Sequence, residues 1–128
     1  MASSVSDRAR LVRLGALAMA SAVALGAFGA HALRARLAPD LLAIYQTGVQ
    51  YHLVHALGLF VAAWLAGEDQ GRAARIAGVL LALGILVFSG SLYLLALTGI
   101  RAFGAITPLG GVAWIVAWVL IAWRVRMK

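Results

Sequence analysis

Long runs of apolar residues, separated by short polar or charged segments, dominate the pattern along the chain. Residues 14–33, 76–100 and 102–123 contain no Asp, Glu, Lys or Arg, and a fourth uncharged run covers 47–67. Each run is close to the roughly 20 residues that a helix needs to cross a hydrocarbon core of about 30 Å. The pattern therefore predicts an all-α polytopic membrane protein, an antiparallel bundle of four transmembrane helices that forms a single domain. The expected spans are 14–33, 47–67, 76–100 and 105–123.

The segments beside these runs indicate where the helices begin. The basic start and the first apolar run also fit a signal peptide, but the run exceeds the usual apolar length of about 7–15 residues, which favours a retained span. Residues 37–45 form a short amphipathic stretch that we expect at the membrane interface. Thr107 and Pro108 have the order of an N-cap and a first helical residue, so regular helix should begin there, beneath the outer surface.

Small residues at regular spacing mark expected contacts between helices. Small side chains let two helix backbones approach closely within a membrane. The expected packing positions are Ala18, Ala22, Gly26 and Ala30 in the first span, and Gly110 and Gly111 in the last. The four-residue spacing in the first span predicts that this helix is central in the bundle.

Composition and charge support the membrane prediction and orient the chain. The 128 residues are 64% hydrophobic and 12% charged, whereas soluble domains have about 25% charged residues. The net charge of +7 is concentrated at segment ends and forms no continuous face, which argues against nucleic-acid binding. Eight basic residues lie on the side of the termini and three on the other. The positive-inside rule therefore predicts both termini in the cytoplasm.

Polar side chains within the spans cluster in the half of the bundle away from the termini. Such groups need partners where water is absent, so the simplest interpretation is a layer of hydrogen bonds between helices. The candidates for this polar layer, or for a ligand site, are His31, Tyr51, His52, His55, Ser89, Ser91, Tyr93 and Thr107. His52 and His55 share a helix face, and we expect His31 to converge on the same pocket.

Four short blocks also resemble a known family. They are GAFGAH at 26–31, YHLVHAL at 51–57, FSGSLY at 88–93 and ITPLGG at 106–111. In this order they are similar to the DUF423 or YgdD-like family of small four-span membrane proteins. The resemblance implies a multi-pass protein of the bacterial plasma (inner) membrane, with relatives in eukaryotes that look mitochondrial. It carries no catalytic residue over to this chain.

The residues leave several functions open. Imidazoles bind zinc, copper and iron, so His31, His52 and His55 are candidate ligands for a metal or haem, although no span contains a carboxylate or thiolate. No particular cofactor is favoured, and the absence of cysteine excludes thiolate sites. A small transporter or channel is a second possibility, but charges within the spans and paired broken helices are missing.

An enzyme is disfavoured because the four acidic residues lie in tails and loops, where none can pair with a buried histidine base. The favoured interpretation is a non-catalytic membrane module. It would act in the lipid bilayer as an accessory or assembly partner of a larger membrane complex, or as a homo-oligomer.

Overall fold

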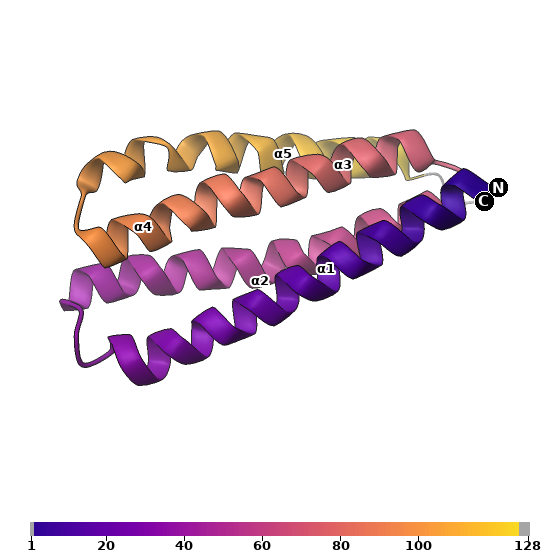
Figure 1. The fold of residues 1–128 in the computed structure, drawn as a ribbon. Coiled ribbons are helices and arrows are strands. Elements are labelled where there is room, and N and C mark those ends of the chain that lie inside the picture. Colours follow the sequence, from indigo (N-terminus) through magenta and orange to yellow (C-terminus); the bar gives the residue numbers. More distant parts are fainter. Residues whose placement is uncertain (1, 126–128) are drawn as a thin grey trace.

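The computed structural model describes residues 2–125, with side chains from residue 5 onward, as a bundle of long helical rods (Figure 1). The first rod is α1 (Ala2–Phe28), which ends in a π-helical turn, η1 (Gly29–Leu33), and the second is α2 (Pro39–Gly67). The third joins α3 (Gly71–Gly84), the π-helical η2 (Ile85–Ser89) and α4 (Gly90–Thr98). The fourth joins the 3₁₀-helical η3 (Arg101–Ala105) to α5 (Thr107–Arg124).

Consecutive rods run in opposite directions, so both ends of the described chain lie at one end of the bundle (Figure 1). All four rods are long and apolar enough to cross a membrane: Val5–Leu33, Pro39–Gly67, Gly71–Thr98 and Arg101–Arg124. No strand occurs among the described residues. The predicted all-α antiparallel bundle of four membrane helices is therefore confirmed.

The structure defines where the second and fourth rods begin. Residues 37–45 form no separate interfacial segment, because α2 begins at Pro39 and continues without a break. Pro39 suits the first turn of a helix, where its missing N–H costs no hydrogen bond. Regular helix in the fourth rod does begin at the predicted point, because α5 starts at Thr107, but the N-cap is Ile106 and no side chain makes a capping bond. The segment before it is a short 3₁₀ helix.

The core lies along α2, which contacts every other rod, so the prediction that the first span is central is wrong. One cluster of buried residues joins α1, α2, α3 and α5 near the end with the termini, and Leu59, Leu81 and Trp114 belong to it. A smaller cluster at the other end contains Leu33, Tyr45 and Ala96. Two glycines allow close approaches: a Cβ at Gly84 would meet the Trp114 indole, and a Cβ at Gly110 would lie 2.5 Å from the Phe88 backbone nitrogen.

The predicted packing stripe of α1 is only partly correct. Ala22 is fully buried and Gly26 packs beside Val49, but Ala30 is exposed. A step of four residues overshoots one helical turn by about 40°, so three steps rotate the stripe by about 120° away from the contact. The buried line instead follows Gly15, Ala22 and Gly29, because a seven-residue step drifts by only about 20°.

Candidate functional site

His52 lies near the middle of α2 and joins three helices. Its Nε2 is 3.3 Å from Ser21 Oγ of α1, and its Nδ1 is 3.0 Å from the Tyr93 hydroxyl of α4. Ser21 Oγ donates its hydrogen to the Ala18 carbonyl, so it accepts from His52 Nε2–H. Nδ1 then accepts from the Tyr93 O–H. Both ring nitrogens of His52 are thus engaged in bonds between helices.

His55 lies one turn further along α2 and has a different environment. Its Nδ1 donates to the Tyr51 carbonyl at 2.7 Å, since a carbonyl oxygen can only accept. Its ring is stacked on Trp114 of α5, with centroids 3.6 Å apart and planes at 5°. The indole N–H of Trp114 donates in turn to the Leu81 carbonyl of α3 at 3.1 Å. His55 therefore packs as part of an aromatic contact between α2 and α5.

The other predicted polar residues form bonds at two further helix contacts. Ser89 donates to the Gly48 carbonyl at 2.7 Å and so links η2 to α2. Ser91 donates to the Phe88 carbonyl, which leaves its oxygen to accept from the Thr107 hydroxyl at 2.6 Å. Tyr51 is half-exposed and lies against Phe88, with ring centroids 4.9 Å apart. Every buried side-chain nitrogen or oxygen in the described part has a hydrogen-bond partner.

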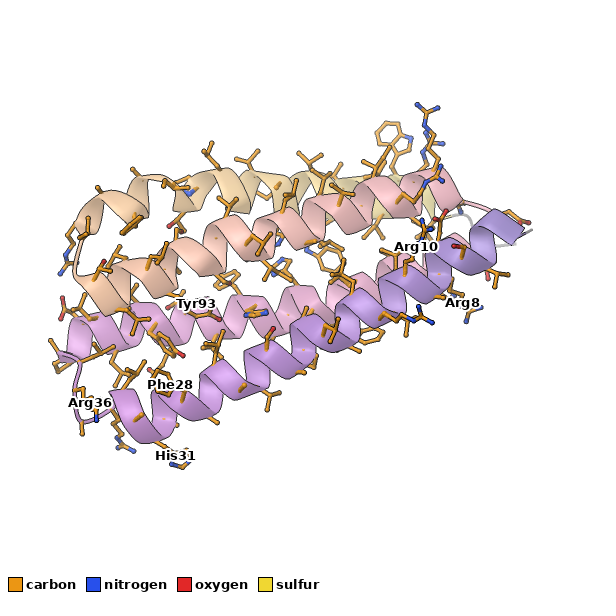
Figure 2. The ribbon with its side chains drawn as sticks, viewed as in Figure 1. Arg8, Arg10, Phe28, His31, Arg36 and Tyr93 are labelled. Carbon is orange, nitrogen blue, oxygen red and sulfur yellow. The ribbon has the colours of Figure 1, made fainter. Side chains whose placement is uncertain are left out.

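The prediction that three histidines converge is wrong. His31 is exposed at the end of the first rod and points away from the bundle, far from Tyr93 (Figure 2). The described residues contain no group of three or more His, Cys, Asp or Glu side chains that could hold a metal. With His31 outside and His52 bonded at both nitrogens, the three-histidine metal or haem set has no common site in the structure.

Sequence reasoning missed three residues of these contacts. Ser21 has a usable signal, because it is the only hydroxyl in the first apolar run. Tyr45 donates to the Leu25 carbonyl at 2.6 Å and packs over Gly29. Trp114 lies among apolar residues of the last span, so nothing in the sequence around it indicates its contact. Hydropathy alone does not distinguish a tryptophan that faces the core from one that faces lipid.

More than half of the chain, including most of these contacts, matches a known protein family. The family model described as "Protein of unknown function (DUF423)" matches residues 25–111. This chain belongs to the DUF423 family. The matched region contains His52, His55, Ser89 and Tyr93, whereas Ser21 and Trp114 lie outside it.

Curated relatives of this DUF423 chain carry the name UPF0382 membrane protein. YwdK of Bacillus subtilis (strain 168) is 53% identical over 109 residues, which cover 84% of this chain and 89% of YwdK. SH2409 of Staphylococcus haemolyticus is 44% identical over 108 residues, with coverage of 84% and 88%. No solved structure matches the chain. The four apolar rods and these relatives identify an integral membrane protein.

Proposed function

We propose that the protein is a non-catalytic module that assembles with other membrane helices, either in a larger complex or with copies of itself. The observation that carries this proposal is the outer face of α1. This face, named here the alanine face, lies opposite the buried line through Gly15, Ala22 and Gly29. Its exposed residues are Ala16, Ala20, Ala24 and Ala27.

Large side chains border the alanine face on both sides. Val12 and Val23 lie along one edge and Leu17 and Phe28 along the other, and all four are exposed. A shallow groove of small residues between two ridges is the surface that lets a second helix approach closely in a membrane. The partner gains van der Waals contact with the backbone, which lipid tails pack against less well.

The exposed sides of the other rods differ from the alanine face. They carry large aliphatic side chains at Val79, Leu83, Leu86, Leu97, Val112, Ile115 and Val119. Such faces suit contact with lipid tails. The contrast supports α1 as the helix that binds a partner.

The interior supports a structural role for the buried histidines. His52 and His55 hold helices together through Ser21, Tyr93 and Trp114. A catalytic base needs a reacting group within hydrogen-bond reach, and both nitrogens of His52 already have protein partners. The non-catalytic proposal follows from this use of the imidazoles.

Single-cysteine crosslinking tests the proposal directly, because the chain has no cysteine of its own. An Ala20→Cys variant, labelled with benzophenone maleimide and irradiated in native membranes, should give one discrete crosslinked product. A dimer identifies self-association, and a product containing another protein identifies a larger complex. Mass spectrometry of the product distinguishes the two.

Val116→Cys provides the matched control, since Val116 is exposed on the lipid-facing side of α5. It should give lipid adducts and no discrete protein product. Adding Ala24→Leu to the Ala20→Cys variant should abolish the product, because the larger side chain fills the groove. Indistinguishable patterns from the Ala20→Cys and Val116→Cys variants would refute α1 as the assembly helix.

A further inference from the structure

A groove runs between α1 and the third rod on another side of α1. Its first part, about 340 Å³, has Asp7, Arg10, Leu14, Arg75, Ala82 and Leu86 among its lining residues. Its second part, about 280 Å³, shares Leu14, Ala82 and Leu86 with the first and continues to Ser21 and His52. The two parts therefore adjoin along α1, and most of the residues that line them are apolar.

The two ends of the groove differ in chemistry. Arg10 and Arg75 lie at the end near the termini, together with the carboxylate of Asp7. Arg75 is 3.3 Å from Asp7, whose side chain is buried. Arg10 is exposed and has no carboxylate partner within ion-pair distance among the described residues (Figure 2). The mouth of the groove thus has a net positive charge.

We propose that this groove binds one anionic phospholipid, with its phosphate at Arg10 and Arg75 and one acyl chain along Leu14, Ala82 and Leu86. Basic pockets between membrane helices bind anionic headgroups because the charge is partly desolvated there. The far end near Ser21 and His52 accepts only the chain terminus, since both polar side chains are already bonded to protein.

The chemistry of the groove favours a lipid over another polypeptide. An apolar groove with a basic end matches an acyl chain joined to an anionic headgroup. The groove also lies on a different face of α1 from the alanine face, and Leu17, which lines the groove, forms the edge between them. The proposal of a lipid in the groove and the proposal of a partner helix on the alanine face are therefore tested separately.

Native mass spectrometry of the delipidated protein tests the proposal. We expect added dioleoyl phosphatidylglycerol to be retained at one equivalent and at least five-fold better than dioleoyl phosphatidylcholine. Arg10→Gln should lower retention of phosphatidylglycerol about five-fold, the factor that corresponds to about 1 kcal/mol for one basic residue near an anionic surface. Ala82→Phe, which fills the acyl groove, should lower retention of both lipids.

Two matched variants complete the design. Arg13→Gln removes an exposed arginine outside the groove lining, and Val116→Phe enlarges a side chain on the outer face of α5. Both should retain phosphatidylglycerol as the wild type does. Equal retention of the two lipids, equal losses from Arg10→Gln and Arg13→Gln, or unchanged retention after Ala82→Phe would each overturn the proposal. Gel filtration and circular dichroism verify that each variant is folded.

Discussion

His52 is the residue that makes hydrogen bonds to two other helices at once. It receives a hydrogen from Tyr93 and gives one to Ser21, so its imidazole bridges α4, α2 and α1 in one chain. Serine and phenol groups inside a membrane would otherwise have no hydrogen-bond partner from solvent. The neutral imidazole, with one donor and one acceptor nitrogen, matches both neighbours at once.

Replacing His52 with leucine should destabilise the bundle. The change removes two hydrogen bonds between helices while keeping an apolar side chain of moderate size. A hydrogen bond between membrane helices contributes about 0.6 kcal/mol on average and less than about 2 kcal/mol at most. We therefore expect the free energy of unfolding to fall by about 1–3 kcal/mol. Titration with sodium dodecyl sulfate in mixed micelles, followed by circular dichroism, measures it.

His31→Leu serves as the control for this change, because His31 is exposed and makes no hydrogen bond among the described contacts. Its free energy of unfolding should stay within about 0.5 kcal/mol of wild type, as is usual for surface substitutions. Similar losses from both substitutions would contradict the bridging role of His52.

The three histidines show which features of a single residue can be predicted from the sequence. His52 and His55 were correctly placed on one helix, and both are buried. His31 was misplaced, because depth in the membrane was inferred but the rotation of its helix was not known. Core and lipid are both apolar, so the hydropathy of the first span does not indicate which side faces the bundle.

The contact between the helical elements η2 and α5 depends on Gly110 and not on its neighbour Gly111. A Cβ on Gly110 would lie 2.5 Å from the Phe88 nitrogen and 2.9 Å from its Cα, whereas a Cβ on Gly111 would stay 3.8 Å from the Phe88 ring. Backbone atoms of a packed helix do not move aside as the end of a flexible side chain can. Gly110 therefore fixes how closely the two helices approach.

Gly110→Ala and Gly111→Ala form a matched pair of variants, for which we expect different effects on stability. We expect the first to lower the free energy of unfolding by about 1–3 kcal/mol, the cost typical of overpacking. The second should change it by less than about 0.5 kcal/mol, and alanine's higher helix propensity offsets part of any loss. Equal effects would show that the observed spacing between η2 and α5 is not maintained in the membrane.

Helix boundaries were predictable where they coincide with special backbone residues. Gly99 ends α4 with φ of 72°, a left-handed conformation that glycine adopts without strain. Pro39 begins α2, but the polar residues after it suggested an interfacial segment. Helix continues through Gln46 and Thr47 because both are exposed and Thr47 bonds back to the Ala43 carbonyl. Polarity alone does not end a helix that packs on its other face.

The two ends of the whole molecule differ in charge. Arg8 and Arg10 lie at the end where the termini meet, and Arg36 lies at the opposite end (Figure 2). At that opposite end Arg101 pairs with Asp40 at 2.7 Å, which offsets part of its positive charge. Arg126 and Lys128, which belong to the predicted cytoplasmic side, lie outside the described residues.

This asymmetry predicts the orientation in the membrane. A fluorescent protein fused after Lys128 should be bright, because it folds in the cytoplasm, and alkaline phosphatase at the same position should be inactive. Fusions truncated after Arg36 should give the reverse pattern. Swapped activities at the C-terminus would place both termini outside and invert the leaflet in which the groove opens.

The number, order and direction of the membrane helices could be predicted from the uncharged runs, because length and hydropathy decide them. The arrangement of neighbours could not. The α1–α2 and α3–α5 contacts depend on where Gly15, Gly84 and Gly110 let backbones approach. The chain has 14 glycines, and sequence does not separate those at contacts from those at turns.

The π-helical turn at Ile85–Ser89 also determines how α4 is rotated about the helix axis relative to α3, the other half of the third rod. Gly90 N–H bonds to the Ile85 carbonyl, five residues earlier, so this turn holds one residue more than an α-helical turn. If the same five residues wound as α-helix, the extra residue would not be absorbed and α4 would rotate by about 100° relative to α3. Tyr93 would then leave His52 and Ser91 would leave Thr107. The contacts between helices therefore depend on the width of this turn as well as on the identity of the side chains that it aligns.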